Sequence, residues 1–307
     1  MIDLDAAVRA ALGAGARVVH TAPSVYATSH VIEDVVVHLA DGRTRTLLLK
    51  RLDELLPGAS AAKPQLVRDV HREIDVYRHL LPRAAIGTAE CVAAGDRWLL
   101  LEKPDGTELY QHGDLEMWRA VARWLPGAHE RLTASLDGAP RRVRDRLLRL
   151  DADWFSLWPR RVTATLERTT DRTWARAVSD RYDLVVDRLA AAPATVLHGE
   201  LYASNVLVCG ELPSPRVCAV DWEMASLGPA VIDLAALVSG SWSEDARAAI
   251  VSAYCEIAPV DDADLAAARL HLAMQWLGWS PTWQAPADHA HDWLTDARSL
   301  SALLGLT

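Results

Sequence analysis

The chain has 307 residues, half of them hydrophobic, and a formal net charge of −9. This length and composition allow a large buried core divided between two lobes, and the negative charge argues against a nucleic-acid surface, which needs a basic field. The sequence has no apolar run of the roughly 18 residues that cross a bilayer, and its first residues are acidic where a signal peptide is basic. We therefore expect a cytoplasmic protein that binds neither nucleic acid nor membrane.

The first hundred residues read as strands with one helix. Alternating or apolar runs predict antiparallel strands at 16–22, 30–39 and 44–50, and an Asp-Gly turn joins the last two. Apolar residues at helical spacing predict an amphipathic helix over 65–81, and a further hairpin follows at 90–103. These elements predict a small antiparallel sheet with one helix.

The composition changes at the turn-rich segment Pro104-Asp105-Gly106. We expect an N-terminal nucleotide-binding lobe at 1–101, a hinge at 102–107 and a catalytic and substrate-binding lobe at 108–307. The larger lobe is mainly helical, with predicted helices at 114–135, 139–157 and 173–191, a hairpin formed by 206–209 and 216–220, and helices from about residue 232 to the end. The expected fold class is α+β, with two lobes of different character.

The segment VLHGELYASNVLV, residues 196–208, is the first candidate for chemistry. Two strand-like runs would hold the ends of this loop on a rigid sheet, so that Glu200 and Asn205 project toward one point. Asp221 immediately follows the strand that is expected to pair with the one leaving the loop, which would bring it near Asn205. An amide oxygen and a carboxylate are suitable ligands for Mg²⁺, although Asp221 alone reads equally well as a turn residue.

Lysine usage marks a second candidate. The chain has only three lysines, Lys50, Lys63 and Lys103, among 32 basic residues. Lys50 ends an apolar strand, where a compact ammonium suits phosphate oxygens. Glu73 lies on the inward stripe of the predicted helix 65–81 and needs a cationic partner, so we expect Lys50 and Glu73 to pair; each residue alone would be read as an ordinary surface side chain.

The ordered set Lys50, Glu73, His198-Gly199-Glu200, Asn205 and Asp221 resembles the aminoglycoside phosphotransferase and choline kinase family, small-molecule kinases with a protein-kinase-like fold. The family signature is HGDxxxxN followed by a strand and D-x-D/E, and this chain has HGELYASN and then DWE. The resemblance extends from about residue 20 to the end. It implies a kinase that uses ATP or GTP and Mg²⁺ to phosphorylate a hydroxyl of a small molecule.

The resemblance also implies roles for individual residues. Lys50 would contact the α- and β-phosphates and Glu73 would hold it, while Asn205 and Asp221 would bind magnesium, with Glu223 as a second acid. The loop 23–30, with Ser24, Thr28 and Ser29, would cover the phosphates, although it also reads as an ordinary hairpin. The hinge, beginning at Glu102 and Lys103, would receive the base.

Glu200 departs from the family pattern, which has aspartate at the position of the base. The longer arm is compatible with a substrate that sits further out, and equally with a nucleotide-binding pseudokinase or a binding module without transfer. His198 is expected to be structural. A second tripeptide, His112-Gly113-Asp114, spells HGD literally, but no strand precedes it, and Asp114 reads as a helix N-cap.

The acceptor is not specified by the sequence: antibiotics, amino alcohols, sugars and natural-product intermediates all remain open. Related enzymes build the acceptor pocket where this chain is rich in rings, namely Trp276, Trp279, Trp283, His289, His291 and Trp293. Core packing is the alternative explanation for the tryptophans. Ten acids against three arginines follow Glu223; they indicate either a solvated helical surface or a pocket for a cationic substrate.

Overall fold

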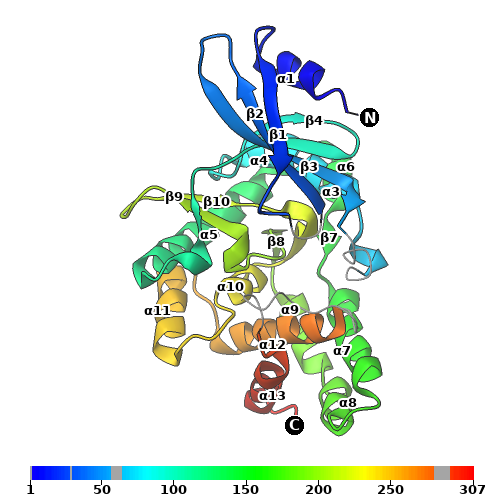
Figure 1. The fold of residues 1–307 in the computed structure, drawn as a ribbon. Coiled ribbons are helices and arrows are strands. Elements are labelled where there is room, and N and C mark those ends of the chain that lie inside the picture. The colour runs from blue at the N-terminus through cyan, green and yellow to red at the C-terminus, as the bar shows by residue number, and fades with distance from the viewer. Residues whose placement is uncertain (1, 28–29, 57–63, 280–290) are drawn as a thin grey trace.

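The computed structural model describes residues 2–27, 30–56, 64–279 and 291–307. Its N-terminal part is a five-stranded antiparallel sheet in the order β1-β2-β3-β5-β4, at the top of Figure 1. The strands are β1 (Arg17–Pro23), β2 (His30–His38), β3 (Thr44–Leu55), β4 (Cys91–Ala94) and β5 (Trp98–Glu102). The predicted strands and both hairpins are confirmed; the N-terminal helix α1 (Leu4–Leu12) was not expected.

The two faces of this sheet have different partners, because successive side chains of a strand point to opposite sides. On one face Leu47 and Leu49 of β3 pack with Val35 of β2 and Val8 of α1 in a small apolar core. Lys50 is the residue after Leu49 in the strand and therefore points to the other face. That face is the one toward the helix that follows β3.

This helix begins later than the sequence pattern predicts. Residues Gln65–Val67 form a 3₁₀ turn and the α-helix α3 spans Val70–Asp75, because the Asp69 carboxylate caps its N-terminus by accepting a hydrogen bond from His71 N at 2.9 Å. Leu66, which regular helical spacing would place on the same stripe as Glu73, is 44 % exposed. The helix continues as a π-helical turn over Val76–Leu80 and ends as α4 (Leu81–Ala84).

The rest of the described chain is mainly helical, as expected, and forms the lower part of Figure 1. Its helices are α5 (Leu115–Ser135), α6 (Arg141–Arg146), α7 (Ala152–Leu166), α8 (Arg172–Asp180), α9 (Asp183–Ala191), α10 (Val231–Leu237), α11 (Glu244–Cys255), α12 (Asp262–Trp279) and α13 (Trp293–Leu303). No helix of the described residues is both long and apolar enough to cross a membrane.

Two predicted helices are wrong in extent. The single helix at 139–157 is interrupted by the strand β7 (Leu148–Arg149), because the amides of Leu148 and Leu150 donate to the carbonyls of Ala225 and Leu227 instead of continuing a helix. The helix at 173–191 is divided into α8 and α9 around the buried Tyr182.

Two small sheets carry the loop 198–205. One is ordered β10-β9-β6, with β10 (Arg216–Ala219), β9 (Val206–Cys209) and β6 (Thr107–Glu108); the other is ordered β7-β11-β8, with β11 (Ser226–Pro229) and β8 (Ala194–Leu197). The expected pairing of β9 with β10 is confirmed. The expectation that one sheet holds both ends of the loop is wrong, because β8 and β9 belong to different sheets.

Candidate active site

The backbone of the loop after β8 is held in place by hydrogen bonds to a buried carboxylate. Asp233 of α10 is 1 % exposed and accepts hydrogen bonds from the backbone N–H of His198 at 2.8 Å and of Gly199 at 2.9 Å. His129 of α5 contacts the same carboxylate at 2.9 Å through Nε2. Asp233 therefore sets the backbone path that leads into Glu200.

Gly199 is required by this path. Its φ is +87°, a conformation that residues with a side chain rarely adopt, and a Cβ at this position would lie 2.2 Å from the carbonyl oxygen of Met224. The turn thus brings the loop into close contact with the segment that follows Asp221.

His198 joins the loop to the strand that leads to Asp221. Its Nε2 donates to the carbonyl of Val220 at 2.8 Å and its Nδ1 accepts from the Glu200 N–H at 3.3 Å. Burial lowers the pKa of His198, and the opposing influence of Asp233 does not reverse that shift. A neutral, buried and fully bonded imidazole fits the structural role that the sequence predicts for His198.

Asn205 and Asp221 are held near each other through the backbone. Asn205 Nδ2 donates to the carbonyl of Glu200 at 2.9 Å, and the Asn205 carbonyl accepts from the N–H of Val220, the residue before Asp221, at 2.9 Å. The side-chain oxygen of Asn205 is then the atom left for another partner. Asp221 itself has φ +64° and ψ +65°, a left-handed conformation that is costly for a residue with a side chain and is concentrated at functional sites.

The predicted pair of Lys50 and Glu73 is present. Lys50 Nζ lies 2.8 and 2.9 Å from the two oxygens of Glu73 and 2.7 Å from Oδ1 of Asp221, and the two residues of the pair are 6 % and 1 % exposed. Burial alone would lower the pKa of Lys50, but the carboxylates of Asp221 and Glu73 outweigh it and raise the pKa above its ordinary value. Lys50 is therefore a permanent cation between two carboxylates.

Arg72, beside Glu73, was not recognised in the sequence. It is 4 % exposed and donates to three backbone carbonyls: Glu223 at 2.6 Å, Arg146 at 2.8 Å and Val67 at 3.0 Å. It connects helix α3 to the segment after Asp221 and to α6. The one feature of the sequence that points to Arg72 is its position next to Glu73, which lies on the inward stripe of the helix.

Other predicted site residues have structural contacts of their own. Glu223 has a carboxylate oxygen 3.5 Å from His30 Nε2 of β2. Both carboxylate oxygens of Glu102 bind the guanidinium of Arg216, at 2.7 and 2.8 Å. Any contact of the hinge with a base would then come from the backbone at this residue or from its neighbours.

Two further predicted site residues, Ser24 and Lys103, lie directly after β1 and β5. Lys103 Nζ lies 2.6 Å from Asp34 of β2 and 5.7 Å from the centre of the Tyr26 ring. Ser24 is buried, and its hydroxyl accepts from the Tyr26 N–H at 3.4 Å. Thr28 and Ser29 lie outside the described residues.

The aromatic residues divide into two groups. Tyr202, two residues after Glu200, accepts a hydrogen bond from Trp276 Nε1 at 2.6 Å, and Trp276 stacks on Trp293 with ring centres 5.6 Å apart. His291 packs on Trp293 at 4.5 Å. We call these four rings the aromatic cluster. One of its members, Tyr202, lies in the loop 198–205 itself.

Trp279 does not belong to this cluster. It is buried and stacks on Trp158 of α7 with ring centres 5.5 Å apart, so core packing explains it, as the alternative interpretation proposed. Trp283 and His289 lie outside the described residues.

A magnesium ion fits the donor set of this site. Among the described residues, no group of three His, Cys, Asp or Glu side chains is placed to hold a metal. Mg²⁺ does not need such a cage, because it is usually bound by one or two protein oxygens, with substrate phosphates and water as the remaining ligands. The side-chain oxygens of Asn205 and Asp221 are of the right type and number.

Comparison with known proteins settles the family. The family model described as "Phosphotransferase enzyme family" matches residues 29–295. The chain belongs to this family. The predicted resemblance is thereby confirmed, and so is the prediction of a small-molecule phosphotransferase. No curated protein matches the sequence.

Solved structures of this phosphotransferase's neighbours agree in fold. A choline kinase from Streptococcus pneumoniae has a TM-score of 0.63 at 14 % identity, covering 99 % of this chain and 97 % of its own. A macrolide 2'-phosphotransferase from Brachybacterium faecium has 0.59 at 15 %, covering 89 % and 90 %, and a Plasmodium vivax ethanolamine kinase has 0.58 at 10 %, covering 92 % and 81 %. The structural similarity establishes the α+β kinase-like fold, and identities this low leave the acceptor open.

Proposed function

We propose that this phosphotransferase moves the γ-phosphate of ATP or GTP to a hydroxyl group of a small molecule, with Mg²⁺ as cofactor. The observation that carries the proposal is the convergence of Lys50, Glu73 and Asp221, with Lys50 Nζ within 2.9 Å of both acids. These residues come from three distant parts of the chain, and a buried lysine held by two carboxylates suits the binding of phosphate oxygens.

The residues would divide the work as follows. Lys50, oriented by Glu73, binds the α- and β-phosphates, and Asn205 and Asp221 hold the metal, with Glu223 as a further acid. Bound Mg²⁺ neutralises charge on the phosphate oxygens. The backbone of the hinge after Glu102 receives the base.

Glu200 would orient the acceptor and take its proton. The acceptor oxygen forms a bond to the γ-phosphorus, the bond from that phosphorus to the bridging oxygen breaks, and the nucleoside diphosphate leaves with the electron pair. The hydroxyl proton passes to the Glu200 carboxylate. Asn205, hydrogen-bonded to the Glu200 carbonyl, keeps the base and the metal position in one rigid loop.

The aromatic cluster suggests the class of acceptor. Tyr202 lies two residues after Glu200 and accepts a hydrogen bond from Trp276, and Trp293 packs on both rings. Such rings bind ring-containing or amine-bearing molecules through stacking and cation–π contacts. We therefore expect an acceptor that carries a ring or an amine, such as an antibiotic or an amino alcohol.

A panel of such hydroxyl compounds, with ATP or GTP and Mg²⁺, tests the proposal through ³¹P NMR of the products. We expect a phosphorylated acceptor and a nucleoside diphosphate in equal amounts. Trp293→Ala should raise the KM of the acceptor and leave the KM of the nucleotide unchanged. The matched control is Trp242→Ala, a half-buried tryptophan that packs on Trp118 instead.

One observation favours a second candidate, nucleotide binding without transfer: the base position is Glu200, one methylene longer than the aspartate of the family pattern. Nucleotide binding without any phosphorylated product would support this candidate. Glu200→Asp separates the two, because a large gain in rate indicates a degenerate base and a loss indicates a site adapted to glutamate.

A further inference from the structure

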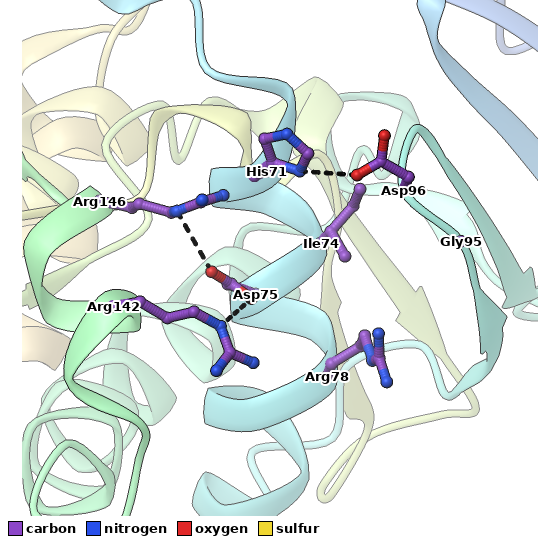
Figure 2. Close-up of a pocket in the computed structure, with 8 residues that line it drawn as sticks. All are labelled: His71, Ile74, Asp75, Arg78, Gly95, Asp96, Arg142 and Arg146. Atoms are coloured by element: carbon purple, nitrogen blue, oxygen red, sulfur yellow. Dashed lines mark hydrogen bonds and ion pairs between the residues drawn. The ribbon is translucent and has the colours of Figure 1, made fainter.

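A cavity lies on the side of helix α3 opposite Lys50. Its volume is about 440 Å³, and it is lined by His71, Ile74, Asp75, Arg78, Gly95, Asp96, Arg142 and Arg146 (Figure 2). His71, Ile74, Asp75 and Arg78 recur at three- and four-residue steps along the helix, whereas Glu73 faces the opposite side. Helix α6 and the turn between β4 and β5 provide the other walls.

The charges that line this cavity are unbalanced. Asp75 is shared by two guanidinium groups: Arg142 Nε lies 3.2 Å and Arg146 Nε 3.4 Å from its carboxylate (Figure 2). Asp96 faces His71 at 3.7 Å. Arg78 makes no hydrogen bond or ion pair with the part of the chain that the structure describes. Among the residues that line the cavity, three arginines against two aspartates leave one positive charge in excess, in a chain whose net charge is −9; Asp69, outside the lining, lies 4.0 Å from Arg146.

We propose that this cavity binds a small phosphate-bearing anion between Arg78, Arg142 and Arg146. Guanidinium groups present several N–H donors in a planar fork that matches phosphate oxygens. Arg142 and Arg146 direct their Nε atoms at Asp75, while Arg142 Nη2 contacts His79 Nε2 at 2.6 Å and Arg146 Nη1 lies 4.0 Å from Asp69. The other terminal nitrogen of each guanidinium, Arg142 Nη1 and Arg146 Nη2, would then bind the anion. A network that only fastened α6 to α3 would pair its arginines and fill the space between them. Here Arg78 has no such partner among the residues that the structure describes, and the space between the arginines is open.

The cavity is connected through helix α3 to Lys50 and Glu73, the pair proposed to bind the nucleotide phosphates. Arg72 Nε donates to the carbonyl of Arg146 at 2.8 Å, and the next residue, Glu73, holds Lys50. The helix also leaves regular α geometry in the π-helical turn Val76–Leu80, which contains Arg78; such turns are frequent at functional sites. An anion that binds α6 and the helix together would hold Glu73 in place, and by linkage nucleotide binding would strengthen anion binding.

Calorimetric titration of pyrophosphate into the wild-type protein and variants tests the site directly. Arg78→Gln and Arg142→Gln should each weaken binding by about tenfold or more, because each removes charge-assisted hydrogen bonds. Arg144→Gln is the matched control: it removes the same charge from the same helix, but Arg144 does not line the cavity. We expect it to change binding by less than about twofold. Arg78 is exposed, so its replacement should not disturb folding.

Four results would overturn the proposal: no binding of pyrophosphate, equal weakening by Arg144→Gln, unchanged binding in Arg78→Gln with loss in Lys50→Gln, or equally tight binding of citrate. The third places the anion in the nucleotide site, and the fourth removes the preference for phosphate. Orthophosphate and glycerol 3-phosphate distinguish a free ion from a phosphate ester. None of these outcomes depends on phosphoryl transfer, so the inference stands or fails separately from the proposed function.

Hydrogen exchange tests the coupling between the cavity and the Lys50 and Glu73 pair. With pyrophosphate bound, amides of residues 70–80 should exchange more slowly in the wild-type protein and at an unchanged rate in Arg78→Gln. Binding without this protection would confine the anion to its own site and refute the coupling.

Discussion

Two segments of this chain carry the tripeptide His-Gly-acid, and they have different roles. His112-Gly113-Asp114 precedes α5, and the Asp114 carboxylate caps that helix by accepting from the Glu116 N–H at 2.8 Å. His198-Gly199-Glu200 follows β8, and its backbone is bound by Asp233. The residue types are nearly the same, whereas the backbone contacts are different.

The glycines show the difference most clearly. A Cβ on Gly113 would have no atom within 4 Å, while a Cβ on Gly199 would lie 2.2 Å from the Met224 carbonyl oxygen. The second loop is therefore held against the segment after Asp221, and the first is open to solvent on this side. A strand before the motif and a buried carboxylate beneath it make the site; the three residues alone do not.

The largest expected difference between the two loops is catalytic. Glu200→Gln removes the group that takes the hydroxyl proton and should lower kcat by about 10²- to 10⁴-fold. Asp114→Asn makes the same chemical change in the other loop and should leave kcat within about twofold. Steady-state turnover of the best acceptor of the panel measures both. Equal losses in the two variants would contradict the assignment of the base.

Asp233 distinguishes the loops by stability. Asp233→Asn replaces a carboxylate that accepts two backbone N–H groups and contacts His129, and it should lower the free energy of unfolding by about 3 kcal/mol. Asp114→Asn alters an exposed cap and should cost about 1 kcal/mol or less. Urea unfolding at pH 7 compares the two; a difference below about 1 kcal/mol between them would refute this role of Asp233.

The pH dependence sharpens the same comparison. Burial raises the pKa of Asp233, but His129 and the Gly199 N–H outweigh it and hold the pKa below the ordinary value of 3.8. A carboxylate with a lowered folded-state pKa stabilises the protein above its unfolded pKa and loses that contribution as the pH falls through the folded value. The stability gap between wild type and Asp233→Asn should be constant from pH 5 to 7 and narrow below about pH 4. A stability gap that widens as the pH falls would contradict a lowered pKa of Asp233.

The smallest expected effect concerns the glycines. Gly199→Ala forces a side chain into a left-handed conformation against a carbonyl oxygen and should cost about 2 kcal/mol. Gly113→Ala meets no atom and should change stability by less than about 0.5 kcal/mol. Thermal unfolding of the two alanine variants provides the measurement, and equal midpoints would show that the close contact at Gly199 is not restrictive.

Local pattern and chain order predicted much of this molecule. The strands of the first sheet follow from alternation and an Asp-Gly turn, and the Lys50 and Glu73 contact follows from a strand end and the inward stripe of a helix. Asp114 as a cap needed only its position before an amphipathic helix. In each case the signal lies within a few residues of the position it concerns.

The features that the sequence did not reveal depend on long-range contacts. The sequence marks Asp233 only as one of the ten acids after Glu223, because its partners lie on a loop and a helix far away in sequence. The break in the predicted helix 139–157 comes from the carbonyls of Ala225 and Leu227, which lie just before and within β11 and accept hydrogen bonds from the amides of Leu148 and Leu150. Trp276 and Trp279 are three residues apart, and only the folded packing assigns one to the aromatic cluster and the other to the core.

The most direct test of the central claim is a calorimetric titration of ATP, with and without Mg²⁺, into the wild-type protein and Asp221→Ala. We expect Mg²⁺ to strengthen ATP binding by at least about tenfold in the wild type and to have no effect in the variant, because Asp221 is the charged residue of the pair, Asn205 and Asp221, that is proposed to hold the metal. Magnesium dependence that survives in Asp221→Ala, or a wild-type protein that binds neither ATP nor GTP, would contradict the account.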